Sequence, residues 1–136
     1  MGSVFQWTKA YSVQVQALDR QHQKLFDTVN ELDEALSRGC GNAVVEDVLK
    51  RLVEYTVSHF AAEEKLMDSS GFPGLAAHRT KHQELTRKVG AFQQEYKAGN
   101  RNVPTALMLF LQNWLKDHIL ATDKKYSEFL NAKGIH

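Results

Sequence analysis

Five of the six histidines in this chain lie at positions where the apolar periodicity of a helix would bury them. Two acidic residues share this pattern, because Glu63 follows His59 by four residues and Asp123 follows His118 by five. Burying an imidazole without a partner costs about 1–3 kcal/mol, and an unpaired carboxylate costs more. A metal ion satisfies several such groups at once. The candidate ligands are His22, His59, Glu63, His78, His82, His118 and Asp123.

The make-up of this set indicates both the number and the kind of metal ion. Five histidines and two carboxylates are too many for one ion and suit two. Each carboxylate has two oxygens and can bridge two cations, which holds them close despite their repulsion. Imidazole-rich ligation favours redox-active iron over magnesium or calcium, which prefer oxygen ligands. Zinc could occupy the same site in vitro, because affinity alone does not exclude it.

Four helical segments would position these ligands. Apolar residues recur in alternating steps of three and four, which predicts four helices. Their approximate ranges are 19–38, 43–69, 74–98 and 103–132. Asn102 before Pro104 is typical of a helix start, and Gly39 and Gly99 are typical of helix ends. Short connections predict an all-α fold, an antiparallel up-down-up-down four-helix bundle, and residues 1–18, rich in aromatics and alternating valines, predict an extended N-terminal arm.

The depth of the ligands along the bundle is consistent with a single site. At about 1.5 Å per residue, His59 lies roughly 25 Å from the start of its helix, and His78 lies near the start of the helix that returns from that end. His118 lies far along the last helix, and His22 lies near the start of the first. We therefore expect all seven groups to converge at one end of the bundle.

The spacing between His118 and Asp123 does not fit a regular helix, because five residues leave them about 140° apart. The apolar pattern of this segment also shifts by one residue between the two positions. A π-bulge inserts one residue into a helix and often occurs at functional sites. We therefore predict a local π-helical distortion between His118 and Asp123.

These motifs resemble the hemerythrin family, in particular its single-domain bacteriohemerythrins, over nearly the whole chain. A lone His-x-x-x-His pair is common by chance, whereas seven ligand positions in this order are specific. The matching features are Trp7 in the arm, Asp19-Arg20-Gln21-His22, His59-x-x-x-Glu63, the Gly71-Phe72-Pro73 turn, His78-x-x-x-His82 and His118-x-x-x-x-Asp123.

The resemblance implies reversible dioxygen binding at a non-haem di-iron centre. It implies that one iron is held by His78, His82 and His118, and that the second is held by His22 and His59. The cofactors would be two iron ions (Fe2+/Fe3+) bridged by Glu63, Asp123 and a hydroxo or oxo group. The first iron would be six-coordinate and the second five-coordinate, and dioxygen would bind at the vacant position.

The resemblance also implies the surroundings of the centre. Tyr126, three residues after Asp123, is expected to hydrogen-bond a bridging carboxylate. An apolar ligand pocket for dioxygen is expected from side chains next to a ligand or one turn away. These are Leu25, Phe60, Trp114, Leu115 and Ile119.

Three classes of function are open to such a bundle. We favour an oxygen carrier, store or delivery protein that is not an enzyme. A di-iron oxidase, peroxidase or nitric-oxide-handling protein is the second, but such bundles use more carboxylates, typically in paired Glu-x-x-His motifs that are absent from this pattern. Oxygen or redox sensing is a third use of the same centre, whereas a phosphotransfer module needs one exposed histidine and would leave four unexplained.

Composition excludes several partners. The 17 Lys+Arg against 16 Asp+Glu give a net charge of +1, which offers no electrostatic basis for binding nucleic acid or an anionic membrane. No apolar run approaches the roughly 18 residues that a membrane span needs, and the first residues do not read as a signal peptide. The single cysteine, Cys40, excludes an internal disulfide and fits a cytoplasmic protein.

The chain of 136 residues suits a single hemerythrin-like domain, 1–136, with an arm (1–18) and a bundle (19–132). No large additional apolar face is evident, so we expect a monomer. Dioxygen is the expected partner, and the sequence does not identify an oxygen-consuming protein that would receive it.

Overall fold

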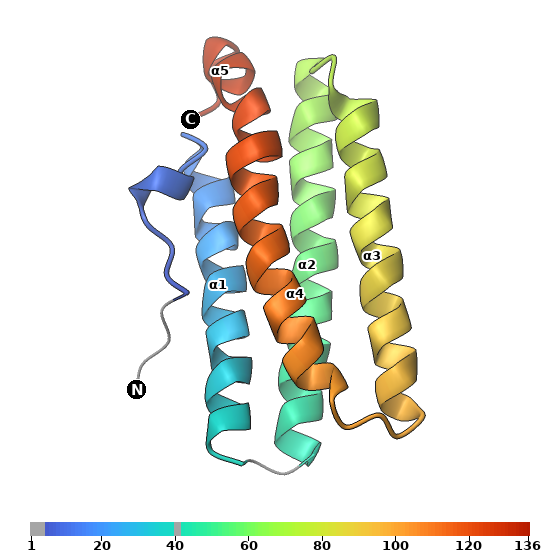
Figure 1. Cartoon of the computed structure of the whole chain (residues 1–136). Helices are drawn as coiled ribbons and strands as arrows, with labels where there is room; N and C mark the ends of the chain where they lie inside the picture. Colours follow the sequence, from blue (N-terminus) through green and yellow to red (C-terminus); the bar gives the residue numbers. More distant parts are fainter. Residues whose placement is uncertain (1–4, 40–41) are drawn as a thin grey trace.

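The computed structural model describes residues 5–39 and 42–136, which form four antiparallel helical rods and no strand (Figure 1). The rods begin with α1 (Gln16–Ser37), α2 (Asn42–Ser70), α3 (Leu75–Lys97) and α4 (Val103–His118). The fourth rod continues from α4 through the π-helical segment η2 (Ile119–Asp123) into α5 (Lys124–Ala132). The predicted all-α, up-down-up-down four-helix bundle is confirmed.

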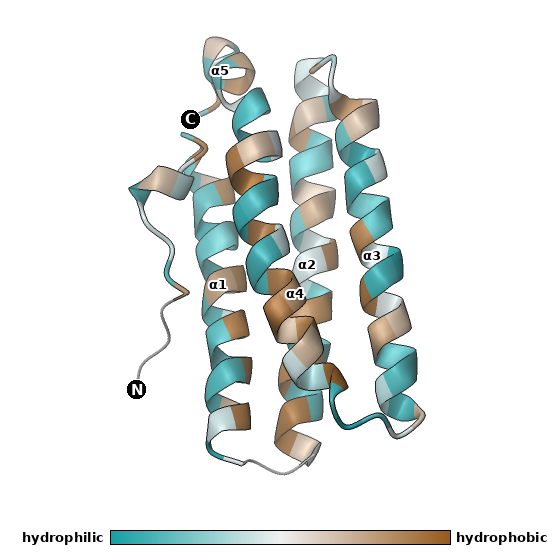
Figure 2. Cartoon of the chain, viewed as in Figure 1, coloured by the Kyte–Doolittle hydropathy of each residue, from teal (hydrophilic) through white to brown (hydrophobic). Residues whose placement is uncertain are grey.

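The apolar positions that predicted the helices form one core. Brown, apolar positions recur along every helix between teal, hydrophilic ones (Figure 2). Leu32 of α1, Leu52 of α2 and Leu107 of α4 are each at most 1% exposed, and Leu85 of α3 is 2% exposed. Burial of such faces, more than intrinsic helix propensity, stabilises helices of this kind.

Helix ends follow the predicted signals with one shift. Gly39 and Gly99 have φ of +65° and +104°, the left-handed conformation in which glycine commonly ends a helix. Asn102 is the N-cap of α4, with Pro104 in its first turn. Helix α1, however, begins at Gln16, three residues earlier than expected. Cys40 lies outside the described residues.

The early start of α1 has a local cause in Asp19. Its carboxylate accepts hydrogen bonds from Ser12 Oγ at 2.6 Å and from the Val13 backbone N–H at 2.9 Å. The Asp19 backbone N–H donates to the Val15 carbonyl at 2.9 Å, which closes the first helical turn. Asp19 therefore joins the arm to the start of the helix.

The arm packs along α1, as Figure 1 shows, but it is less extended than predicted, because Lys9–Tyr11 form a short 3-10 turn, η1. The Phe5 ring stacks on Phe26 of α1 with 4.2 Å between ring centroids. Val13 is fully buried, and its carbonyl accepts a hydrogen bond from Ser127 Oγ of α5. The arm thus bridges the first and last helices of the bundle.

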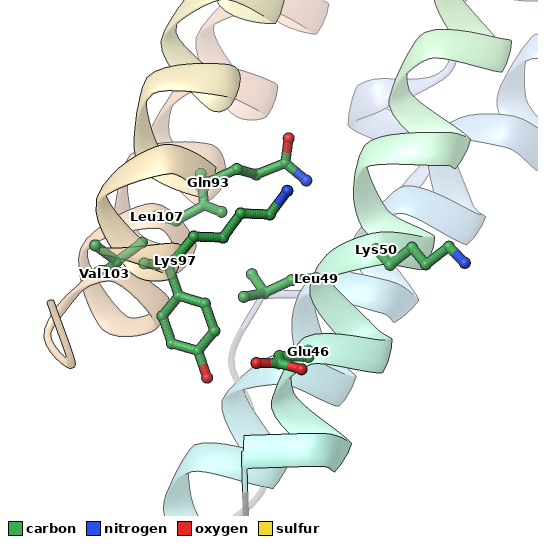
Figure 3. A pocket seen from close by; sticks show the side chains of 8 residues that line it. Glu46, Leu49, Lys50, Gln93, Lys97, Val103 and Leu107 are labelled. Carbon is green, nitrogen blue, oxygen red and sulfur yellow. The ribbon is translucent and has the colours of Figure 1, made fainter. Parts of the chain in front are cut away.

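A half-open hollow of about 210 Å³ lies between α2, α3 and α4 (Figure 3). Leu49, Val103 and Leu107 form its apolar floor, and Lys50 and Lys97 stand at its rim. It lies toward the end of the bundle where α2 begins and α3 ends.

No described helix is long and apolar enough to cross a membrane.

Candidate metal centre

Each of the four rods contributes to a buried polar cluster near the end of the bundle opposite that hollow. α1 supplies one histidine, α2 a histidine and a glutamate, α3 two histidines, and the fourth rod a histidine and an aspartate. All seven side chains are buried, none more than 6% exposed. The residues are His22, His59, Glu63, His78, His82, His118 and Asp123. The expected convergence on one end of the bundle is confirmed.

The predicted π-helical distortion is also confirmed. η2 spans Ile119–Asp123, directly between the last residue of α4 and the first of α5. The wider π turn brings a residue five positions on to the same face as its start. As a result, Asp123 Oδ1 lies 2.9 Å from His118 Nε2.

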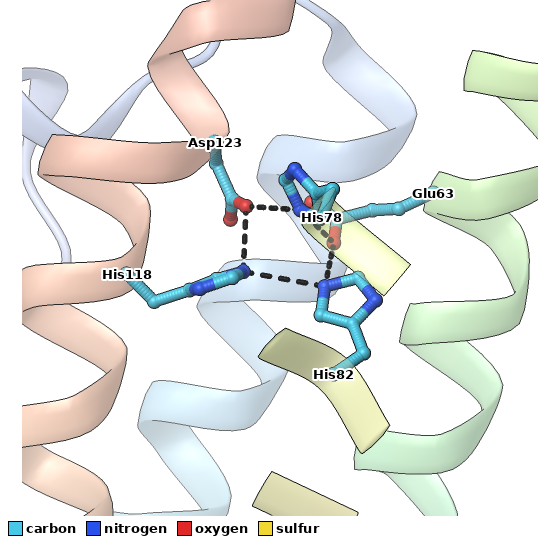
Figure 4. Close-up of side chains that lie close together, drawn as sticks. All are labelled: Glu63, His78, His82, His118 and Asp123. Carbon is cyan, nitrogen blue, oxygen red and sulfur yellow. Dashed lines mark hydrogen bonds and ion pairs between the residues drawn. The ribbon is translucent and has the colours of Figure 1, made fainter. Parts of the chain in front are cut away.

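The seven side chains form two overlapping groups whose potential ligand atoms lie within 4.8 Å of one another. The first, which we call the three-histidine group, contains His78, His82 and His118 (Figure 4). The second, the two-histidine group, contains His22 and His59. Both carboxylates belong to both groups. This division matches the one that the family resemblance implied.

The two oxygens of Glu63 face different groups. Glu63 Oε1 lies 3.2 Å from His82 Nε2 and 3.7 Å from His78 Nε2, on the three-histidine side. Glu63 Oε2 lies 3.4 Å from the Nε2 atoms of both His22 and His59, on the two-histidine side. A carboxylate placed in this way can bridge two cations.

Asp123 is divided between the groups in the same manner. Its Oδ1 lies 2.9 Å from the Nε2 atoms of His78 and His118. Its Oδ2 lies 3.1 Å from His22 Nε2. Two carboxylates on different helices therefore each direct one oxygen toward each histidine group.

Several of these atoms are close without being hydrogen-bonded. His22 Nε2, His78 Nε2, Glu63 Oε1 and both Asp123 carboxylate oxygens are buried and make no hydrogen bond of acceptable geometry within the described residues. In addition, His82 Nε2 and His118 Nε2 lie only 3.2 Å apart. Two imidazole nitrogens at this distance need a proton or a cation between them. The donor set therefore fits two metal ions of the kind that bind imidazole and carboxylate.

Electrostatics in the metal-free cluster are dominated by the paired charges. Burial lowers the pKa of His22 and His78, but their contacts with Asp123 and Glu63 outweigh it and raise both pKa values to about 9. Burial raises the pKa of Glu63, yet the surrounding histidines hold it well below its usual range. The pKa of His118 is lowered, chiefly by burial. Protons on His22 and His78 thus compete with a metal ion for the carboxylates.

The outer atoms of the ligands have partners of their own. Tyr126 donates a 2.5 Å hydrogen bond to Glu63 Oε2, as the resemblance implied. His59 Nδ1 lies 2.7 Å from Gln21 Oε1, and His82 Nδ1 lies 2.9 Å from Glu64 Oε2. Sequence reasoning missed Gln21 and Glu64 as partners, although each is adjacent in sequence to a predicted ligand. Gln21 also belongs to the Asp19-Arg20-Gln21-His22 motif, whereas adjacency to Glu63 was the only signal for Glu64.

The five residues predicted to form a ligand pocket are of two kinds, two rings that contact ligand histidines and three aliphatic side chains of the core. Phe60 stacks on His82 with centroids 3.7 Å apart, and Trp114 stacks on His118 with centroids 4.1 Å apart. These two rings line separate surface hollows beside the cluster. The remaining side chains are core residues, none more than 4% exposed: Leu25, Leu115 and Ile119. Each ring thus covers one face of a histidine that lines the same hollow, Phe60 over His82 and Trp114 over His118.

Comparison with known proteins identifies the family. The sequence model described as "Hemerythrin HHE cation binding domain" matches residues 13–130. The chain belongs to the hemerythrin family. All seven clustered residues lie inside the matched range, so the buried histidine and carboxylate groups are part of a hemerythrin-family cation-binding domain and are suitable for a di-iron site.

Relatives match this hemerythrin-family chain over most of its length. A bacteriohemerythrin of Stenotrophomonas maltophilia (strain R551-3) is 31% identical over 126 residues, covering 93% of this chain and 81% of the relative. A bacteriohemerythrin of Methylococcus capsulatus (strain Bath) is 33% identical over 127 residues, covering 93% and 96%. A crystal structure of wild-type hemerythrin superposes with a TM-score of 0.85 at 34% identity, covering 94% of this chain and 98% of that one.

Proposed function

We propose that this chain binds dioxygen reversibly at a non-haem di-iron centre and acts as an oxygen carrier, store or delivery protein rather than as an enzyme. The observation that carries the proposal is the division of Glu63 and Asp123, each with one oxygen toward each histidine group. Membership of the hemerythrin family supports it.

In this proposal the three-histidine group would hold one iron and the two-histidine group the second, with Glu63 and Asp123 shared between the two groups. The irons, when bound, would supply the electrons that reversible dioxygen binding requires. Tyr126 keeps Glu63 in its bridging orientation through its hydrogen bond. Burial and the charge of Glu63 raise the pKa of Tyr126 well above its usual value, so the phenol keeps its proton.

The apolar surroundings favour binding over further chemistry. Leu25, Leu115 and Ile119 are buried core residues within three positions of a candidate ligand in the sequence, and the Phe60 and Trp114 rings cover two of the histidines. Side chains of this kind exclude water and so limit the supply of protons. In the proposal they form the dioxygen pocket. Only two carboxylates lie among the ligands, fewer than in oxidative di-iron bundles.

The test is an anaerobic optical titration of the iron-loaded, reduced protein with air, followed by removal of oxygen. A colourless protein that gains a visible charge-transfer band and loses it under vacuum would support a reversible carrier. A transient band that decays to a stable oxidised spectrum would favour an oxidase or a sensor instead. An absent iron-dependent band would overturn the proposal.

Matched variants make this titration specific to the site. Glu63→Gln keeps the shape of the side chain but removes a bridging charge, and we expect it to abolish the band. Glu95→Gln makes the same chemical change at an exposed position toward the far end of α3, and we expect it to leave the band unchanged.

We further infer that residues 1–136 act as one domain, as a cytoplasmic monomer whose partner is dioxygen and not a nucleic acid or a membrane. Light scattering of the iron-loaded protein tests the monomer, and a mass of twice 15.5 kDa would overturn it.

A further inference from the structure

We propose that Glu64 is a positioning residue that makes His82 a more strongly electron-donating imidazole than His59, its counterpart in the two-histidine group, and that Arg79 holds Glu64 in place for this purpose. The consequence is an asymmetric centre, in which the three-histidine group binds its metal more tightly and favours the higher oxidation state. This inference rests on the proposed function, because it describes the same site.

A chain of three side chains leads from the cluster to the surface. His82 is 2% exposed, and its Nε2 faces Glu63 Oε1 inside the cluster at 3.2 Å. On its outer side, His82 Nδ1 lies 2.9 Å from Glu64 Oε2. Glu64 Oε1 in turn accepts a 3.0 Å hydrogen bond from Arg79 Nε. The two carboxylate oxygens of Glu64 thus have different partners, one in the core and one at the surface.

This chain fixes the state of the His82 ring. An ionised carboxylate only accepts hydrogen bonds, so His82 Nδ1 must donate its N–H to Glu64. Nε2 is then left with a free lone pair that points into the cluster. A carboxylate that accepts the outer N–H draws the proton toward itself and leaves more electron density on the metal-binding nitrogen.

The two-histidine side has a weaker counterpart. His59 Nδ1 faces Gln21 Oε1 at 2.7 Å, so its partner is a neutral amide. An amide oxygen fixes the tautomer just as a carboxylate does, but it carries no full charge. Hydrogen bonds to ionised groups are roughly twice as strong as neutral ones. The two sides therefore differ by one negative charge placed behind one ligand.

Arg79 limits how far Glu64 can move. Glu64 is on α2 and Arg79 is on α3, one turn before His82. The Arg79 side chain is 45% exposed and that of Glu64 is 22% exposed. An ion pair this accessible to water contributes little to stability. Its directed hydrogen bond instead keeps the second oxygen of Glu64 aimed at His82.

A purely structural reading assigns Glu64 and Arg79 to an ordinary ion pair that joins α2 to α3. The two readings differ in what they predict for the metal. A helix-joining pair would affect unfolding only, whereas a positioning residue changes the affinity of one metal position and the electronic state of one histidine.

The first experiment uses cobalt(II), which requires neither iron nor dioxygen. Metal-free protein is titrated with cobalt(II) in competition with a chelator, and we expect two bound equivalents in the natural sequence. Glu64→Gln should lower the affinity for one of the two cobalt ions by ten- to a hundred-fold and leave the affinity for the other unchanged. Arg79→Gln keeps the Glu64 charge and should lower the affinity for the same cobalt ion by a smaller factor.

Two variants serve as matched controls. Gln21→Glu places a carboxylate behind His59, so it should strengthen the other equivalent. Glu95→Gln removes a charge from an exposed position on α3 and should change neither. Circular dichroism checks that each variant folds. If Glu64→Gln does not fold, the test rests on Gln21→Glu, which should strengthen cobalt binding where Glu64→Gln would have weakened it.

The second readout reports on the histidine itself. In the zinc-loaded, diamagnetic protein, the Nδ1 proton resonance of His82 should move upfield in Glu64→Gln, while that of His59 stays in place. In the iron-loaded protein, Glu64→Gln should raise the reduction potential, by 59 mV for each ten-fold loss of preference for the ferric ion.

The outcomes separate this inference from the proposed function. If Glu64→Gln binds two cobalt ions as Glu95→Gln does and leaves the His82 resonance unchanged, the inference is overturned while reversible dioxygen binding stands. If the natural sequence itself fails to bind two metal ions, the proposed function fails and this inference fails with it.

Discussion

The two ends of this bundle bury different kinds of side chain. Where α1 ends and α2 begins, the helices bury aliphatic residues such as Leu32, Val48 and Leu52, none more than 3% exposed. Toward the other end, the same helices bury five histidines and two carboxylates. The aliphatic end gains free energy from removing apolar surface from water, whereas the polar end incurs a desolvation cost that its ion pairs offset only in part.

This difference separates stability from function along the length of one fold. The aliphatic end can hold four helices together whether or not metal is bound, and so it keeps the ligands near their binding positions. Without metal, the charges at the polar end are partly compensated. The raised pKa values of His22 and His78 keep these histidines protonated, and their positive charge balances Glu63 and Asp123. We therefore expect a metal-free protein that is folded and less stable than the loaded one.

The largest effect should come from the aliphatic end. Leu52→Ala removes a side chain that is 1% exposed, and such truncations cost about 2–5 kcal/mol of unfolding free energy. Because Leu52 lies seven residues before His59, about 10 Å along α2, the loss should be nearly the same with and without metal, and two metal ions should still bind. Urea unfolding of both forms measures it, with Leu52→Met as the control that retains volume. A loss of metal stoichiometry would show that the two ends are not independent.

The next largest effect should come from metal itself. A ligand that binds only the folded state stabilises it by about 4 kcal/mol when its free concentration is 1,000 times its Kd. Zinc or ferrous iron should therefore raise the unfolding midpoint of this protein, and a chelator should reverse the change. In Asp123→Asn most of this gain should disappear. An equal gain in both proteins would contradict a bridging role for Asp123.

The main features of both ends could be predicted from the sequence, because both depend on periodic spacing. Steps of three and four placed Leu32 and Leu52 in the core by the same rule that placed His22 and His59 there. The five-residue spacing from His118 to Asp123 likewise predicted the π-helical segment. In a regular helix the two side chains would point in different directions, and one inserted residue lets both face the cluster.

The outer partners of the histidines could not be predicted in this way. Gln21 and Glu64 are polar residues at partly exposed positions, where helix periodicity predicts an ordinary solvated side chain. Their contacts depend on the distance between neighbouring helices and on the rotamer chosen, which the spacing of residues along one helix does not determine. The start of α1 was missed for a similar reason, because Asp19 turns back to the arm.

A smaller effect at the polar end should follow from Tyr126→Phe. The change removes the hydrogen bond to Glu63 Oε2 and leaves a fully buried carboxylate with one partner fewer. Loss of a partner to a buried polar atom costs about 1–3 kcal/mol, and metal affinity should fall with it. Tyr96→Phe, beside the hollow at the aliphatic end, is the control and should change stability much less. Equal losses in the two variants would remove the distinction between the ends.

The most gradual effect, spread over more than two pH units, should appear in the pH dependence of the metal-free protein. The pKa of His22 and His78 is raised from 6.5 to about 9 by contact with Asp123 and Glu63, which outweighs burial. A raised pKa contributes stability that is fully present below pH 6.5 and is lost as the pH rises through about 9. Unfolding free energy of the metal-free protein should therefore decline between these values. The loaded protein should not show the decline, because its ligands have already released their protons. Calorimetric titration with zinc at pH 7.5, in buffers of different ionisation enthalpy, should therefore detect protons released on binding. If no protons are released, His22 and His78 are already neutral before metal binds, which would contradict the raised pKa values.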